Sequence, residues 1–218
     1  MHPFDLKART LAQVAATPSP TRPDGARRTA TLVLAAALSG IVLFQAAGGL
    51  EHASGRPLRL TWGIAGGWLF WSAALSWLVL RRGRSTLGAR PGLLRLAALA
   101  TPLVSLAWLH AFSGTYAEPS GRVGFRCLAG TLLIASPLLA ALFVARRGVD
   151  PRAPRTLGCA LGAVAGAWAG VLVDLWCPLT NLSHVFIGHA LPLASMIGIG
   201  ALAGGFALGA RALPRRAA

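Results

Sequence analysis

Six long apolar stretches, separated by short connectors, constrain the fold of this chain more than any other feature of its sequence. Each is close to the ~20 residues that an α-helix needs to cross the hydrocarbon core of a bilayer. Hydrophobic residues make up 55% of the 218 positions and charged residues only 12%, whereas a typical soluble domain has about 25% charged residues. The sequence therefore predicts an all-α membrane protein with six transmembrane helices, near Thr29–Gly49, Leu60–Leu80, Gly92–Phe112, Gly124–Ala145, Leu157–Trp176 and Phe186–Ala210.

These stretches divide the chain into three parts. Residues 1–28 are a polar N-terminal segment, residues 29–210 form the transmembrane domain, and residues 211–218 are a short C-terminal tail. A cleaved secretory signal starts its apolar run within a few residues of the N-terminus and ends in a small-residue cleavage site. Here 28 residues precede the first apolar run, and no A-x-A pattern closes it. We therefore expect the first helix to remain in the mature protein.

The basic residues are distributed unevenly over the connectors, and this asymmetry predicts the orientation in the membrane. The formal net charge is +15, and 17 of the 21 lysines and arginines fall in the N-terminal segment, in or just after the second connector, in the fourth connector and at the C-terminus. Cytoplasmic loops of membrane proteins are enriched in Lys and Arg, so we expect both termini to be cytoplasmic, in the inner membrane of a bacterium. Topology then accounts for the charge, and we expect contact with membrane lipid and no direct binding of nucleic acid. The basic residues on the outer side are Arg56, Arg59, Arg122 and Arg126.

The N-terminal segment combines a short amphipathic helix with a linker. The sequence predicts a helix over residues 3–16, with Phe4, Ala8, Leu11 and Ala15 on one face. The stretch TPSPTRPDG that follows, residues 17–25, has three prolines and a glycine and favours an extended linker. Such a helix suits either the groove of a partner protein or the surface of the inner leaflet. The residues expected to contact a partner are Phe4, Leu6, Leu11 and Val14.

A period of four residues marks the fifth predicted span. Gly158, Gly162, Gly166 and Gly170 recur at this interval, and Asp174 is next in the series. Four residues advance an α-helix by about 400°, so these positions form one slowly winding stripe. Small residues let membrane helices approach closely, and we expect this stripe to make the most intimate contact inside the bundle. The alternative is that it forms the face of a homodimer.

Thiol and imidazole side chains are predicted to gather at the outer rim of the bundle, because consecutive spans run in opposite directions. A further cysteine, Cys159, lies near the cytoplasmic end of the fifth span, and we interpret it as a small apolar core residue. The five residues expected at the outer rim are His110, Cys127, Cys177, His184 and His189.

The two outer cysteines are open to two chemical interpretations. The outer face of a bacterial inner membrane is oxidising, so Cys127 and Cys177 could form a disulfide, which requires Cα atoms within about 7 Å. Alternatively, both thiolates with His184 and His189 supply the four ligands of a tetrahedral site for a soft or borderline metal ion. The two histidines are about 140° apart around an α-helix, so we expect one of them to precede the helix.

Asp174 is unusual because it lies about one turn inside the fifth span. A carboxylate at this depth is costly unless it is paired or hydrated. Arg126, immediately before Cys127, is the partner that the sequence favours, and Asp174 shares a helix face with Cys177. Its role would be either a salt bridge between the fifth and fourth helices or a response to protons or metal ions.

No catalytic set can be assembled from the sequence. There is no nucleophile–base pair in a defined context, no glycine-rich phosphate loop after a strand and no H-E-x-x-H motif. A convincing inverted repeat and a polar path across the membrane are also missing, which argues against a transporter. We therefore expect a protein that is not an enzyme and has no resident cofactor, with a soft or borderline metal ion as a candidate signal.

Four short motifs in the second half of the chain carry a resemblance to a known family. They are F-R-C-L at residues 125–128, A-R-R-G at 145–148, W-C-P at 176–178 and H-V-F-I-G-H at 184–189. With six spans and a short polar N-terminal segment, this order resembles the NrsF-type family of bacterial membrane anti-sigma factors. These proteins negatively regulate extracytoplasmic-function (ECF) sigma factors.

The resemblance implies a membrane-bound sensor. Its N-terminal segment, residues 1–28, would sequester an ECF-type sigma factor, and the outer cysteine pair, here Cys127 and Cys177, would respond to oxidants or heavy metals and release it. His184 and His189 match the histidine pair that follows C-P in the family. One alternative is a membrane thiol-redox or metal-handling protein using the same cysteines, although the chain has no C-x-x-C motif. A structural subunit of a larger membrane complex is another.

Overall fold

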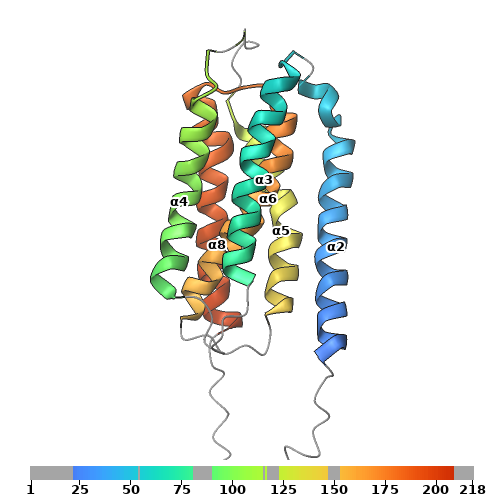
Figure 1. Ribbon diagram of the computed structural model, residues 1–218, viewed down its shortest axis with the longest axis vertical. Coiled ribbons are helices and arrows are strands. Elements are labelled where there is room, and N and C mark those ends of the chain that lie inside the picture. Colours follow the sequence, from blue (N-terminus) through green and yellow to red (C-terminus); the bar gives the residue numbers. More distant parts are fainter. Residues whose placement is uncertain are drawn as a thin grey trace, which may run out of the picture.

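All regular elements among the residues placed in a computed structural model of the chain are helical, which confirms the predicted all-α fold (Figure 1). The structure describes residues 22–53, 55–80, 90–114, 116, 123–146 and 153–208. A 3₁₀ turn, η1 (Gly49–Ala53), follows the first helix, and a π-helical turn, η2 (Phe186–Ala190), joins the last two. The α-helices are α2 (Arg22–Ala46), α3 (Leu58–Leu80), α4 (Pro91–His110), α5 (Phe125–Ala145), α6 (Pro154–Trp176), α7 (Leu182–Val185) and α8 (Leu191–Ala207).

Within the described residues, five helices are long and apolar enough to cross a membrane, as expected of a multi-pass membrane protein. They are α3, α4, α5, α6 and the continuous run of α7, η2 and α8 over Leu182–Ala207. The apolar part of α2 is shorter and covers Ala30–Ala46, about 25 Å at 1.5 Å per residue. This length is slightly less than the ~30 Å hydrocarbon core, and the count of six spans stays a prediction.

The beginning of α2 corrects one sequence prediction. The linker expected over residues 17–25 is in part helical, because α2 begins at Arg22. A proline in the first turn of a helix costs no hydrogen bond, since the first amide groups have no intrahelical partner, and Pro23 is therefore compatible with the helix. Residues 1–21, which include the predicted partner-binding residues Phe4, Leu6, Leu11 and Val14, lie outside the described residues.

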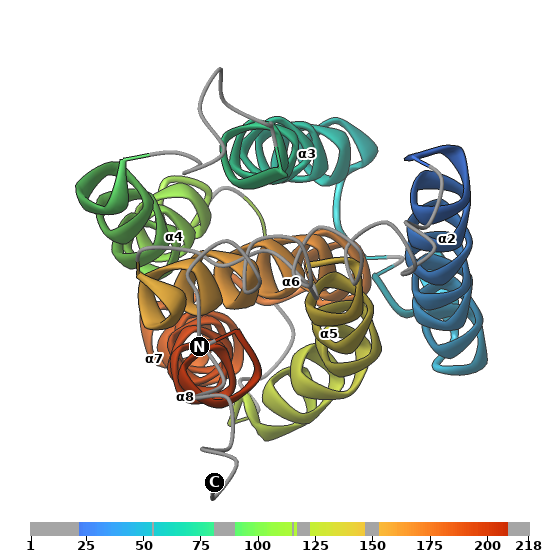
Figure 2. The same cartoon turned by 90° about the horizontal axis from the view of Figure 1, so that it is seen from below.

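The helices run up and down around α6, which is the most deeply buried of them (Figure 1). Figure 2 shows α6 in the middle of the bundle, with α3 and α4 on one side, α5 and α8 on the other, and α2 beyond α5. Glycine and alanine occupy most of the buried positions of α6, and such small side chains allow several helices to approach closely. The composition of α6 therefore explains its central place.

The glycine stripe of α6 packs against α8, in agreement with the predicted contact inside the bundle. A methyl group built on Gly158 would overlap the backbone oxygen of Gly200, and one built on Gly162 would overlap the backbone oxygen of Met196. The two helices thus touch backbone to backbone. Gly170 differs, because a methyl group built there would meet no atom within 4 Å.

The surface of the bundle is apolar along its length, as contact with lipid requires. Large side chains such as Phe70, Leu99 and Leu133 are exposed, whereas several small polar side chains are buried. The hydroxyl groups of Thr101 and Thr131 each donate to the carbonyl oxygen four residues earlier, at 2.9 Å. Helix backbone therefore satisfies these buried polar groups, as expected for helices in lipid.

The up-and-down order gives the bundle two chemically different ends (Figure 1). We call one the basic end; here α2, α4 and α6 begin and α3, α5 and α8 finish. The opposite end holds the beginning of α5, the last turn of α6 and the run through α7 and η2. The sequence predicts that the basic end faces the cytoplasm. The arginines at this end whose side chains the structure describes are Arg27, Arg90, Arg95, Arg146 and Arg155.

Candidate functional site

Four of the five thiol and imidazole side chains meet in one buried cluster at the end opposite the basic end. Cys127 lies in the first turn of α5, Cys177 directly follows α6, His184 is in α7 and His189 is in η2. One potential ligand atom from each side chain lies within 4.8 Å of the others. All four residues are between 2% and 5% exposed, so bulk water is excluded. We call them the Cys/His cluster.

His184 is central to the contacts within the Cys/His cluster. Its Nε2 atom lies 3.1 Å from Sγ of Cys177 and 3.4 Å from Sγ of Cys127. The centroids of the His184 and His189 rings are 5.6 Å apart. Both cysteines are free thiols, so the same four groups are available for thiol oxidation or for metal binding.

A π-helical turn explains how two histidines five residues apart reach the same cluster. Both lie in helical backbone, so the expectation that one precedes the helix is wrong. In η2 the N–H of Leu191 donates to the carbonyl of Phe186, five residues earlier. A π turn adds one residue to the hydrogen-bonded loop, which lowers the rotation per residue and brings His184 and His189 to one side. Such turns are frequent at functional sites.

Local contacts hold this helical run against α5. The side-chain oxygen of Asn181 accepts a hydrogen bond from the backbone N–H of His184 at 3.0 Å and caps α7. A methyl group built on Gly188 would lie 3.0 Å from Cβ of Cys127, and one built on Gly124 would overlap the backbone of Gly188. The two glycines therefore let α5 and η2 touch, which keeps Cys127 next to the histidines.

Asp174 pairs with His189, and the predicted salt bridge to Arg126 is wrong. Its Oδ1 atom forms an ion pair with Nδ1 of His189, and both side chains are buried. Arg126 is exposed because it lies one residue before the buried Cys127, and each residue rotates an α-helix by about 100°. The carboxylate thus joins α6 to η2. The other ring nitrogen of His189, Nε2, has no hydrogen-bond partner among the described residues.

Arg56 is a site residue that sequence reasoning missed. It lies between η1 and α3 and is only 4% exposed. Its guanidinium donates to the backbone oxygens of Asp174 at 2.6 Å and Cys177 at 2.8 Å, while its Nε donates to Oγ1 of Thr61 at 3.1 Å. The last carbonyl groups of a helix have no intrahelical partner, so Arg56 caps α6 at the cluster. The sequence feature that could have indicated Arg56 is its place among the few basic residues of the predicted outer side.

Two of the residues considered from the sequence do not join the cluster. His110 is exposed at the last position of α4, and its Nδ1 lies 3.3 Å from Oγ of Ser113. It therefore lies at the predicted end of the bundle, where α4 finishes, but outside the Cys/His cluster. Cys159 is half-buried near the other end of α6 and packs against apolar residues that include Ile197 of α8, in agreement with the apolar role predicted for it.

The donor set of the cluster fits a soft or borderline metal ion such as Zn²⁺. Two thiolates and two imidazoles are a common ligand set for such ions, and here all four groups are buried together. Metal-binding histidines usually donate their second ring N–H to a carboxylate or carbonyl, which is the relation of His189 to Asp174. Cys127, Cys177, His184 and His189 are the residues that would hold the ion.

Comparison with known proteins assigns a family to the whole bundle. A family model described as NrsF, negative regulator of sigma F, matches residues 11–209. The matched range includes every helix that the structure describes and all four residues of the Cys/His cluster. No curated protein and no solved structure matches the chain.

Proposed function

Because this chain belongs to the NrsF family of negative regulators of sigma F, we propose that it is a membrane-bound anti-sigma factor. It sequesters an ECF-type sigma factor at the inner membrane of a bacterium and releases the factor when a stress signal reaches the Cys/His cluster. The family match over residues 11–209 is the observation that carries the proposal. The buried convergence of thiols and imidazoles supports the finer statement about the signal.

The proposed output is the N-terminal segment. Its apolar residues Phe4, Leu6, Leu11 and Val14 would bind the sigma factor, as a short amphipathic helix binds in a groove. The last part of this segment, from Arg22 onward, forms the first turns of α2 at the basic end. A movement of α2 would therefore change how the segment is presented.

The proposed input is a change in the bonding of the Cys/His cluster. An oxidant would take two electrons from Cys127 and Cys177, release two protons and leave a disulfide. A soft or borderline metal ion would instead be held by both thiolates and by His184 and His189. Either event replaces the contacts of His184 Nε2 with the two sulfur atoms and so changes how α5, α6 and η2 pack.

Two hydrogen bonds offer a route from the cluster to α2. Nε1 of Trp176, at the end of α6, donates to the backbone oxygen of Ala47 at 2.9 Å, just after α2. Arg56, which follows η1, binds the backbone oxygen of Cys177. The helix α2 also packs along α5, whose first turn holds Cys127. We infer that a displacement around Cys177 reaches α2 through these contacts.

Affinity purification tests the proposal directly. The tagged full-length protein and a version lacking residues 2–20 would be extracted in mild detergent, and co-eluting proteins would be identified by mass spectrometry. We expect a sigma factor in near-stoichiometric amount with the full-length protein and none with the shortened one. The absence of a sigma factor from both would contradict the anti-sigma function.

One observation favours a second candidate function, a metal-handling membrane protein. Four buried metal-ligand groups within 4.8 Å of one another would serve ion binding even without a sigma factor. This candidate predicts that cells lacking the protein accumulate or lose a soft metal while sigma-factor activity stays unchanged. Metal content of such cells, measured beside transcription of sigma-dependent genes, separates the two functions.

A further inference from the structure

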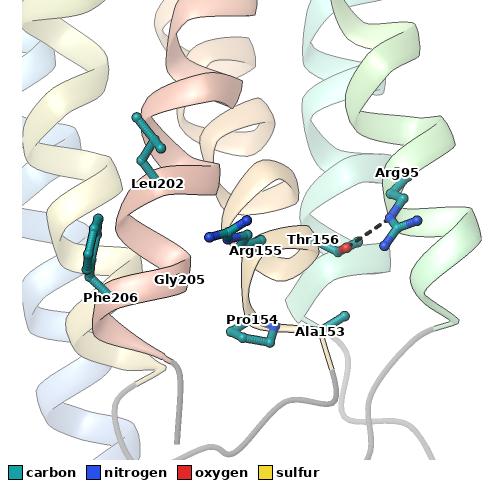
Figure 3. Close-up of a pocket in the computed structure, with 8 residues that line it drawn as sticks. All are labelled: Arg95, Ala153, Pro154, Arg155, Thr156, Leu202, Gly205 and Phe206. Carbon is teal, nitrogen blue, oxygen red and sulfur yellow. Dashed lines mark hydrogen bonds between the residues drawn. The ribbon is translucent and has the colours of Figure 1, made fainter. Parts of the chain in front are cut away.

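The basic end of the bundle contains a second candidate site, a pocket of about 450 Å³ between α4, α6 and α8 (Figure 3). Its lining includes the first turn of α6 from Pro154 to Thr156, Arg95 of α4 and the last two turns of α8. The Cys/His cluster lies at the other end of α6, so the two sites share a helix but no residue.

Two arginines give this pocket its charge. Arg95 and Arg155 are both exposed, and Nε of Arg95 donates to Oγ1 of the buried Thr156 at 3.0 Å. That hydrogen bond holds the Arg95 guanidinium at the wall of the pocket (Figure 3). Among the described residues, the carboxylate that forms an ion pair is that of Asp174, which pairs with His189 at the opposite end of the bundle. The pocket therefore presents two cationic groups without a described acidic partner.

The Arg155 side chain lies directly over a glycine of α8. A methyl group built on Gly205 would come within 3.3 Å of both Cγ and Nε of Arg155, so the arginine crosses α8 directly over this residue. A larger side chain at position 205 would displace it. The neighbouring Gly204 packs against the α6 backbone, which fixes α8 close enough for this contact.

The backbone adds to the positive potential of the arginines. The α6 helix begins in this pocket, its N-cap residue Ala153 makes no side-chain capping hydrogen bond, and its first turn contains no acidic residue. The first N–H groups of a helix have no intrahelical partner and carry a partial positive charge. Side chains and backbone thus favour the same kind of ligand, an anion.

One wall of the pocket is apolar and open to the surroundings of the bundle. Leu202 and Phe206 lie one turn apart on α8 and are 66% and 87% exposed. An exposed aliphatic and aromatic strip beside a cationic pocket matches a ligand with an anionic head and a hydrocarbon tail. It does not match a free inorganic anion, which gains nothing from apolar contact.

We propose that this pocket binds an anionic phospholipid of the inner leaflet. The phosphate lies between Arg95 and Arg155, near the first turn of α6, and an acyl chain follows Leu202 and Phe206. Basic pockets between membrane helices on the cytoplasmic side are suited to anionic headgroups, and the basic end is the one predicted to face the cytoplasm. The site requires the membrane orientation but not the anti-sigma function.

Native mass spectrometry of the full-length protein in a neutral detergent tests this proposal. Phosphatidylglycerol and phosphatidylcholine would be titrated in parallel into the wild type, the pocket pair Arg95→Gln/Arg155→Gln and a control pair Arg27→Gln/Arg90→Gln. The control removes two exposed arginines from the same end, outside the pocket. Inorganic phosphate in large excess forms a further arm that separates a lipid headgroup from a free anion.

We expect phosphatidylglycerol to bind the wild type in preference to phosphatidylcholine and to resist displacement by phosphate. An arginine near an anionic surface contributes about a fivefold factor in affinity, so the pocket pair should bind about 25-fold more weakly. The control pair should change by less than about threefold, because its charges act only at long range. Circular dichroism would verify that each variant is folded, and Arg155→Gln alone, with a loss of about fivefold, replaces the pair if the pair does not fold.

Three results would overturn the proposal. Equal losses in the pocket and control pairs would show general attraction to the basic end. Displacement of the lipid by phosphate would show a simple anion site. A pocket pair that keeps its lipid but loses the co-purifying sigma factor would show that these arginines contact an acidic protein surface instead.

Discussion

The two ends of α6 use polar residues in opposite ways. At the Cys/His cluster, two thiols, two imidazoles, Asp174 and Arg56 are all buried, and each is tied to a neighbouring helix or turn. At the basic end, Arg95 and Arg155 are exposed around an open pocket. A buried polar network has few alternative arrangements because an unsatisfied member is costly, whereas an exposed arginine keeps its hydration. The polar groups of one end are therefore held together in the bundle interior, whereas those of the other end are open to the surroundings.

The two ends of α6 also depend on different helix contacts. The cluster depends on backbone contact between α5 and η2 at Gly124 and Gly188. The basic end depends on backbone contact between α6 and α8, at Gly158 and Gly204. If the α6–α8 contact is rigid, a change at the cluster that moves α6 leaves this contact intact.

Replacement of either cluster cysteine should abolish the response to oxidants. Cys127→Ser and Cys177→Ser each remove one of two thiols that face the same imidazole, whereas Cys159→Ser changes a cysteine near the basic end. Transcription of a sigma-dependent reporter after oxidant treatment would measure the response. We expect no induction in the first two variants and normal induction in the third; normal induction in all three would contradict a thiol input.

A single methyl group on the α6 stripe should destabilise the whole bundle. In Gly162→Ala the new methyl group would overlap the backbone oxygen of Met196, which cannot rotate away, and overpacking of this kind costs about 3 kcal/mol. Gly170→Ala is the matched control, because it has no atom within 4 Å and alanine favours a helix by up to about 1 kcal/mol. Denaturant unfolding in detergent compares the two. Equal stability would mean that the stripe is not the tight contact.

Arg56 should stabilise the cluster end selectively. Arg56→Ala leaves the backbone oxygens of Asp174 and Cys177 without their donor, at a cost of about 2 kcal/mol. Arg59→Ala, which removes an exposed arginine nearby, should cost less than about 0.5 kcal/mol. The rate of maleimide labelling at Cys177 should rise only in the first variant. Similar labelling in both would contradict a role of Arg56 in closing the cluster.

The smallest expected effect concerns the residue that orients His189. If the cluster binds Zn²⁺, Asp174→Asn should weaken the affinity by about tenfold, because the partner of a metal-binding histidine tunes the ligand. His110→Ala should leave the affinity unchanged, since His110 is exposed and lies outside the cluster. Competition with a chromogenic chelator measures both. A loss in His110→Ala equal to that in Asp174→Asn would mean that the ion binds elsewhere.

The sequence predicted the features that depend on composition and period. Hydropathy placed the long helices, because each apolar run is close to the thickness of a bilayer. The four-residue period of glycines on α6 predicted its close packing, which occurs with α8. Opposite directions of consecutive helices predicted that Cys127, Cys177, His184 and His189 share one end. These inferences need only the order of elements along the chain.

The sequence did not predict the features that depend on local backbone register or on long-range partners. The π turn over Phe186–Ala190 has no hydropathy signature, yet it brings His184 and His189 together. The sequence favours Arg126 as the partner of Asp174 because it immediately precedes Cys127, but the Arg126 side chain is exposed while that of its neighbour Cys127 is buried. Arg56 reaches α6 from a connector far away in the sequence, and no periodic pattern records such a contact.

In the proposed mechanism, the Cys/His cluster controls a sigma factor bound at the other side of the membrane. This control is tested by the amount of sigma factor that washed membranes retain before and after oxidant treatment. Wild-type membranes and membranes carrying the double variant Cys127→Ser/Cys177→Ser would be compared. We predict release of the sigma factor from the wild type and retention by the double variant. Retention by both, or release from both, would contradict the claim.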